Sequence, residues 1–330
     1  MNRKTVYFTA PLQVELREES LSALGTDDVL VETICSAISA GTEMLVYRGQ
    51  FPHLADAHDS FSSNLNYPLA YGYACVGHIR EIGNQVDQSL LDKLVFGFQP
   101  HTSAFICNPS ALIIAPDSFP AETCSFLPNM ETAVNLVQDA APILGERALV
   151  LGQGVIGLLV TALLNEFPLE TLVTSDCYEI RRQASQALGI KTSFDPENKE
   201  LSTLEQNKFD LTFELSGRPE TLNDALAFTT FSGRILIGSW YGEKRAPVDL
   251  GGAFHRSRIK LISSQVSTIA PELSGRWDKA RRFKVAWEAL KRIQPQKWIT
   301  HRFPVEDAAK AYRLLDEHPQ EAIQVLFTYP

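Results

Sequence analysis

The sequence predicts an α/β protein in two parts, a mainly β domain and a doubly wound parallel sheet. Short strands separated by Gly and Pro residues fill roughly the first third of the 330-residue chain, which is typical of a compact β domain. From about Cys124 strands alternate with helical stretches, as in a parallel sheet built from βαβ units. At the first of these strands, residues 148–159 read ALVLGQGVIGLL. The glycine-rich turn inside this segment indicates a ligand-binding site, as argued below.

The elements are expected in a fixed order along the chain. The N-terminal residues 1–16 read as one strand, and further strands of the β domain are expected at 29–34, 75–82, 93–98 and 104–107. The parallel sheet is expected to use strands at 148–151, 172–174, 211–215 and 234–238, with helices at 130–139, 178–188 and 219–228. The chain should end with a charged helix, a strand, an amphipathic helix and a strand at 277–292, 298–303, 305–315 and 322–328.

The glycine-rich turn has the pattern Gly-x-Gly-x-x-Gly between an apolar strand and an apolar helix. Gly152 suits a tight turn, Gly154 lets the backbone approach a pyrophosphate, and Gly157 lets the helix pack on its strand. The N–H groups of Val155 and Ile156 then lie at the positive end of the helix dipole, which attracts phosphate. We therefore expect a bound dinucleotide here.

The side chain expected at the adenosine ribose is Asp176, which ends an apolar run 19 residues after Gly157. A carboxylate at this place accepts hydrogen bonds from ribose hydroxyls and repels a 2′-phosphate, so NAD(H) is favoured. Arg181 lies five residues further on and is within reach of the same ribose. Arg181 and Arg182 leave NADP(H) possible, unless both only solvate one face of a helix.

Composition points to a soluble enzyme of the cytoplasm. The net charge of −9 and a pI near 5.3 argue against a nucleic-acid backbone or an anionic membrane as partner. No apolar stretch is long enough to span a bilayer, and the N-terminus lacks the apolar core of a secretory signal. The five cysteines are scattered, as expected for free thiols in a reducing compartment. A small-molecule substrate is the expected partner.

Motifs along almost the whole chain resemble the medium-chain dehydrogenase/reductase superfamily. They are SAGTEM at 39–44, YPLAYGYACVG at 67–77, the glycine turn, ELSG at 214–217, SGRILIG at 232–238 and ITHRFP at 299–304. The resemblance implies a GroES-like catalytic domain over residues 1–126 and 266–330 and a Rossmann domain over 127–265.

The resemblance also implies ligand contacts and an assembly. Thr132 matches a threonine near the nicotinamide, and Ser216 and Gly238 end strands where loops meet the cofactor. A homodimer is expected, with an edge strand around residues 246–250 pairing across a two-fold axis.

The chain departs from the zinc-dependent members at all three catalytic ligand positions, which carry Ala40, Tyr73 and Pro128. Catalytic zinc needs three protein ligands, and alanine and proline cannot supply them through their side chains. The four-cysteine lobe of a structural zinc is missing too. We therefore expect a zinc-free protein and interpret Glu43 as a structural charge. The best-matching branch is bacteriochlorophyllide a dehydrogenase, although Ala74 stands where that branch keeps a glutamate.

Without a metal, either the substrate is already electrophilic or side chains must move the proton. Thr42 matches a proton-relay hydroxyl, but it equally suits a cap for a helix starting at Glu43. Tyr73 takes the vacated histidine position and either donates to substrate or only fills space. His53 and His58 lie in a polar segment and are weaker candidates, and His301 is interpreted as structural.

Two functions remain open. The first is a zinc-independent NAD(P)(H)-dependent oxidoreductase that acts on a hydrophobic carbonyl, alcohol or quinone. The second is a cofactor-binding but catalytically silent relative with a structural or redox-sensing role.

Overall fold

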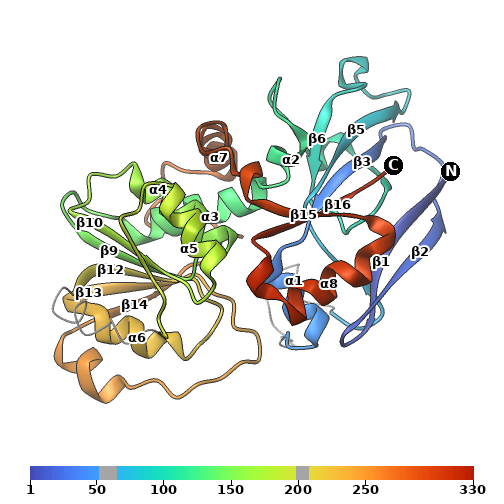
Figure 1. The fold of residues 1–330 in the computed structure, drawn as a ribbon. Coiled ribbons are helices and arrows are strands. Elements are labelled where there is room, and N and C mark those ends of the chain that lie inside the picture. The colour runs from blue at the N-terminus through green and yellow to red at the C-terminus, as the bar shows by residue number, and fades with distance from the viewer. Residues whose placement is uncertain (52–64, 198–207) are drawn as a thin grey trace. The chain divides into compact units, whose positions relative to one another are not determined.

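The computed structural model describes residues 1–51, 65–197 and 208–330 and divides into two compact units (Figure 1). Unit 1 comprises Met1–Pro128 and Leu290–Pro330, and unit 2 comprises Asn129–Ala289. The boundary expected at 265/266 from the sequence differs from this division, because residues 266–289 group with unit 2. Buried contacts between α7 (Lys279–Ile293) and α3 (Leu127–Ala140), described below, account for that difference.

Unit 1 is built on two sheets. The smaller sheet has the order β2-β1-β4 and consists of Gln13–Ser20, Asn2–Ala10 and Leu69–Ala70. The larger has the order β15-β16-β3-β5-β6-β8, and β7 also pairs with β3. Its strands are β3 (Val29–Ala37), β5 (Cys75–Ile82), β6 (Leu94–Gly97), β7 (Ala104–Cys107), β8 (Leu112–Ile114), β15 (Ile299–Pro304) and β16 (Gln324–Thr328). Strands from both chain ends therefore share one sheet.

The single N-terminal strand expected over residues 1–16 is wrong, because β1 and β2 form an antiparallel hairpin. The chain reverses at Pro11 and Leu12, and Leu12 adopts the left-handed conformation with a φ of 63°. Apolar residues continue through this turn, so hydrophobic patterning alone does not reveal it.

Helices α1 (Ala40–Arg48) and α8 (Ala308–Glu317) cover the main core of unit 1, and α2 (Ala121–Cys124) is short. The buried residues of α8, Ala308, Ala311, Tyr312 and Leu315, recur at helical spacing and pack with Phe8 and Phe327 in one apolar cluster. Short 3₁₀ turns lie at Gln88–Leu90, Pro109–Ala111, Pro295–Trp298, Val305–Asp307 and Pro319–Glu321. Among the helices of the described residues, none is long and apolar enough to cross a membrane.

Unit 2 contains a six-stranded parallel sheet with the order β11-β10-β9-β12-β13-β14. Its strands are β9 (Arg147–Leu151), β10 (Thr171–Ser175), β11 (Thr192–Phe194), β12 (Phe209–Glu214), β13 (Thr229–Ile237) and β14 (Lys260–Ser263). The crossover helices are α4 (Val155–Asn165), α5 (Glu179–Ala187) and α6 (Thr221–Phe228).

The strand order reverses between β9 and β12, which are hydrogen-bonded neighbours. Right-handed crossovers in opposite directions place α4 and α5 on one face and α6 on the other, as Figure 1 shows. Ligands of such doubly wound sheets bind at the carboxyl edge, at the point where the order reverses. The glycine turn follows β9 and therefore lies at that point.

The edge strand expected around residues 246–250 is wrong. Residues 246–249 are irregular, and Leu250–Phe254 forms a π-helical turn that the side chain of Asp249 caps. Among the described strands, β11 and β14 form the two edges of the sheet.

Candidate functional site

The glycine turn of unit 2 has the close backbone approaches that its sequence predicts. Gly152 has a φ of 95°, and a Cβ there would lie 2.5 Å from the carbonyl oxygen of Leu215. A Cβ at Gly157 would overlap the carbonyl oxygen of Gly152, so the start of α4 packs directly on the turn. Gly154 is the N-cap of α4 and has open space beside it. The turn therefore presents the first N–H groups of α4, at Val155 and Ile156, toward the carboxyl edge.

Asp176 holds this turn in place. One carboxylate oxygen accepts from the backbone N–H of Gln153 at 2.7 Å, and the other accepts from that of Tyr178 at 2.8 Å. The residue is 6% exposed. Because each carboxylate oxygen has two acceptor sites, Asp176 retains acceptor capacity toward a ribose. The side chain thus positions the turn and keeps acceptor capacity for the ribose that the sequence predicts here.

Arg181 and Arg182 have different surroundings. Nη1 of Arg181 lies 3.9 Å from Oδ2 of Asp176 and 4.0 Å from a Cβ built on Gly154, and its guanidinium stacks on Tyr178. Arg182 donates to the carbonyl oxygens of Asp176 and Cys177 at 2.8 and 2.9 Å and pairs with Asp195. The interpretation that both arginines only solvate a helix face is therefore wrong. Arg181 lies beside the glycine turn, and Arg182 fixes the loop after β10.

Other strand ends of unit 2 contribute a buried carboxylate that sequence reasoning missed. Glu214 ends β12 and accepts from the backbone N–H and hydroxyl of Ser216 and, at 2.5 Å, from the hydroxyl of Tyr241. Ser216 therefore points its hydroxyl inward. A Cβ at Gly238 would lie 2.6 Å from the side chains of Leu136 and Leu215, so this glycine serves packing. Thr132 is partly buried on α3.

In unit 1, three hydroxyl groups meet at the start of α1. The hydroxyl of Tyr73 donates to Oγ of Ser39 and lies 3.5 Å from Oγ1 of Thr42. Burial raises the pKa of the Tyr73 phenol, which keeps it protonated, while its bonds to Ser39 and Thr42 oppose the shift. Ser39 is the N-cap and α1 begins at Ala40, so Thr42 lies within the first turn rather than capping a helix that starts at Glu43. Ser39 was missed by sequence reasoning, although Ser is a favoured N-cap residue.

Beneath this hydroxyl cluster lies a carboxylate with three donors. Glu43 is fully buried and accepts from the backbone N–H of Ser39 at 2.8 Å, from His101 Nε2 at 2.8 Å and from the hydroxyl of Tyr312 at 2.6 Å. His101 Nδ1 lies 2.6 Å from Oγ of Ser36. Donation from Nε2 of His101 to Glu43 and acceptance at Nδ1 from Ser36 satisfy both contacts. The interpretation of Glu43 as a structural charge agrees with this arrangement.

The former metal-ligand positions do not offer a donor set. Ala40 begins α1, Pro128 lies in the first turn of α3, and Tyr73 belongs to the hydroxyl cluster. In the described ranges 1–51, 65–197 and 208–330, no three His, Cys, Asp or Glu side chains come together to hold a metal ion. His53 and His58 lie outside the described residues. His301 lies in β15, where its ring stacks on Phe303.

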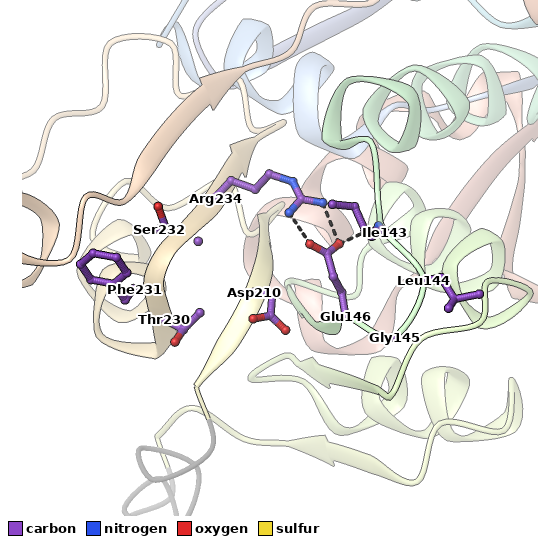
Figure 2. Close-up of a pocket in the computed structure, with 10 residues that line it drawn as sticks. Ile143, Leu144, Gly145, Glu146, Asp210, Thr230, Phe231, Ser232 and Arg234 are labelled. Atoms are coloured by element: carbon purple, nitrogen blue, oxygen red, sulfur yellow. Dashed lines mark hydrogen bonds and ion pairs between the residues drawn. The ribbon is translucent and has the colours of Figure 1, made fainter.

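A pocket of about 330 Å³ lies at the opposite, amino-terminal edge of the parallel sheet (Figure 2). It is lined by residues around the starts of β9, β12 and β13. In its wall Arg234 forms two hydrogen bonds of 2.6 and 2.7 Å with Glu146, which neutralises both charges. Because nucleotides bind at the carboxyl edge of such sheets, we do not assign this pocket to the cofactor.

The chain resembles known dehydrogenases over most of its length, although no protein-family model matches it. It is 22% identical to L-idonate 5-dehydrogenase (NAD(P)(+)) of Escherichia coli (strain K12), covering 76% of this chain and 73% of that protein. It is 22% identical to L-threonine 3-dehydrogenase of Legionella pneumophila (strain Corby), covering 88% and 90%. A solved alcohol dehydrogenase (rspB) from Escherichia coli CFT073, complexed with NADH, superposes with a TM-score of 0.79 at 17% identity, covering 99% of each chain.

These comparisons confirm the predicted fold class, a GroES-like domain with a Rossmann domain. The named relatives are themselves dehydrogenases, which agrees with the class of protein expected from the sequence. Their substrates differ from one another, so the substrate of this chain remains a proposal.

The glycine turn provides a matched pair of variants. Gly154→Val places its side chain in open space on the phosphate path, so the fold should persist while NADH affinity falls at least about tenfold, or 1.4 kcal/mol. Gly157→Val collides with backbone and should lower stability by on the order of 2 kcal/mol. Calorimetric titration and thermal melts measure both effects. Unchanged NADH affinity in a folded Gly154→Val protein would contradict the placement of the pyrophosphate.

Burial of Tyr312 gives a pH dependence of stability. Desolvation and the neighbouring Glu43 raise the pKa of Tyr312 well above its usual value near 10. Above pH 10 the unfolded chain has lost this proton while the folded chain keeps it, so the free energy of unfolding falls as pH rises through the folded pKa. One tyrosine contributes a slope of at most about 1.4 kcal/mol per pH unit. Denaturant melts from pH 9 to 11 should show a shallower decline for Tyr312→Phe, and an equal slope would argue against this assignment.

Proposed function

We propose that the protein is a zinc-independent NAD(P)(H)-dependent oxidoreductase. The observation that carries the proposal is the glycine turn, where Gly152 and Gly157 pack the start of α4 against the end of β9 and leave Gly154 open. A nicotinamide dinucleotide fits this arrangement, because its pyrophosphate needs free N–H groups and a close backbone approach. When bound, the nicotinamide supplies or accepts the hydride.

The chain's own contribution to the chemistry is a protonated phenol. Tyr73 holds its proton because burial raises its pKa, and it has Ser39 and Thr42 as hydrogen-bonding neighbours. In the reducing direction Tyr73 donates to the developing alkoxide of a carbonyl substrate. Ser39 and Thr42 keep the phenol oriented and relay its replacement proton. In the oxidising direction the relay runs in reverse, so that the phenol takes the proton of an alcohol while it passes its own proton through Ser39 and Thr42 to solvent.

Zinc independence rests on the donor chemistry of three positions. Ala40 and Pro128 carry no ligating side-chain atom, and the phenol of Tyr73 already donates to Ser39. A Lewis acid is therefore replaced by a weak proton donor, which suits an electrophilic or readily oriented substrate. This favours a hydrophobic carbonyl, alcohol or quinone, including a hydroxyethyl side chain of the kind that bacteriochlorophyllide a dehydrogenase oxidises.

NAD(H) is the proposed coenzyme, and NADP(H) is the alternative. Asp176 opposes a 2′-phosphate by like-charge repulsion, whereas Arg181 lies 3.9 Å from that carboxylate and offsets part of the repulsion. The proposed assembly is a homodimer in the cytoplasm. A spectrophotometric screen at 340 nm with carbonyls, alcohols and quinones tests the enzyme against the silent relative, because steady turnover of any of them excludes the latter.

Tyr73→Phe separates the proposed proton transfer from a purely structural role. The variant keeps the ring and removes the donor, so turnover of a simple ketone should fall by about 10²-fold. Reduction of a quinone should fall less, since a quinone accepts hydride with less acid assistance. Tyr7→Phe is the matched control, because its hydroxyl also donates to a side chain, Glu19, in the same unit. Equal losses for both substrates would mean that Tyr73 only shapes the pocket.

Metal analysis tests zinc independence directly. The purified protein should contain well under one zinc per chain, and prolonged treatment with a chelator should leave turnover unchanged. Elemental analysis that finds one tightly held zinc per chain would contradict the proposal and would require ligands other than Ala40, Tyr73 and Pro128.

A further inference from the structure

A stripe of polar side chains runs along one face of α3 and has no role in the site described so far. Glu131, Asn135 and Asp139 are spaced four residues apart, so they lie on the same side of the helix. Glu131 and Asn135 are buried. All three bind residues that follow β14 in the sequence.

The central partner of the stripe is Arg282 on α7, whose side chain is completely buried. Its guanidinium donates to Glu131 Oε1 from Nε at 3.1 Å and from Nη2 at 2.8 Å, and Nη1 donates to Asn135 Oδ1 at 2.5 Å. Nη1 also donates to the carbonyl oxygen of Thr268 at 3.1 Å, and Nη2 to that of Val266. The guanidinium is thus committed to the stripe and to the backbone of the loop, so it acts on a ligand only through that backbone.

The start of the same loop is fixed by a second set of contacts. Asn135 Nδ2 lies 2.9 Å from Oγ of Ser264, and Ser264 donates to Asp139 Oδ2 at 2.5 Å. Asn135 therefore contacts both ends of the segment, Ser264 directly and Val266–Thr268 through Arg282. The stripe holds residues 264–268 in one conformation without any regular secondary structure.

The position of this segment relative to the nucleotide follows from the sheet. The backbone N–H of Ser264, just after β14, donates to the carbonyl oxygen of Ile237 at the end of β13. In the same way the N–H of Gly152, just after β9, donates to the carbonyl oxygen of Ser175 at the end of β10. Segment 264–268 therefore lies on the carboxyl edge that carries the glycine turn. Asp176 marks the adenosine side, beyond β10, and the pyrophosphate lies over α4. The nicotinamide half must then run the other way, across β12 and β13 toward β14.

We infer that Arg282, held by Glu131 and Asn135, is a positioning residue for the nicotinamide half of the dinucleotide. It sets the backbone of residues 264–268, whose remaining N–H and C=O groups form the polar wall at that end. The inference rests on the proposed function, because it requires a dinucleotide bound at the glycine turn. It predicts that disturbing Arg282 weakens the binding of the nicotinamide half of the cofactor and leaves the binding of the ADP-ribose half unchanged.

Binding of NADH and of ADP-ribose, which lacks the nicotinamide, provides the test. Arg282→Lys keeps the charge but loses the planar fork, and it should weaken NADH by about tenfold while leaving ADP-ribose within about twofold of wild type. Arg281→Lys is the matched control, because the neighbouring Arg281 is exposed, stacks on Trp277 and bonds the carbonyl of Arg276. It should change neither affinity.

Ser264→Ala covers the case in which Arg282→Lys does not fold. It removes one hydroxyl from the loop and should give a smaller loss with the same selectivity for NADH. Equal losses of both ligands, or no loss of NADH in a folded variant, would overturn the inference. Failure of the wild-type protein to bind either ligand would instead overturn the proposed function, and the inference with it.

Discussion

A buried carboxylate ties together the two ends of the chain in unit 1. Glu43 accepts hydrogen bonds from the start of α1, from the loop that carries His101 and from Tyr312 on α8. A buried carboxylate is costly unless it is hydrogen-bonded, and each oxygen of Glu43 has at least one donor. Removing one of these donors leaves a buried acceptor short of a partner, which costs about 1–3 kcal/mol. The hydroxyl cluster of Ser39, Thr42 and Tyr73 depends on this contact, because Ser39 and Thr42 belong to the same turn as Glu43.

Activation of a substrate by a metal and activation by a side chain place different demands on a protein. A metal would supply charge stabilisation at a fixed point, and the protein would then need only to orient the substrate. In the function proposed above, the proton donor is the phenol of Tyr73, whose hydroxyl donates to Ser39. The fold that the solved relatives share with this chain therefore does not identify the group that would activate a substrate.

Local patterns predicted the parallel sheet and the glycine turn, because each depends on residues close together in sequence. Close backbone approaches require glycine at positions 152 and 157, and Asp176 accepts a hydrogen bond from the backbone of the turn. All three residues lie within 25 positions of one another. Contacts such as Glu43 with His101, or Glu131 with Arg282, join residues 58 and 151 positions apart. No pattern of neighbouring residues marks these contacts, so the sequence alone did not reveal them. The prediction of an edge strand around residues 246–250 failed for a different reason. Whether an edge strand forms depends on the strand it pairs with as much as on its own residues.

The two hydrogen bonds that Asp176 makes to backbone N–H groups constrain how coenzyme preference can change. In an enzyme whose carboxylate only hydrogen-bonds the ribose hydroxyls, a neutral residue could replace it and allow NADP(H) to bind. In this protein the same exchange would release the N–H groups of Gln153 and Tyr178 and loosen the glycine turn. Selection or engineering toward the phosphorylated coenzyme is therefore directed to Arg181 and its neighbours on α5. Asp176, just after β10, is needed to hold the glycine turn whichever coenzyme is used.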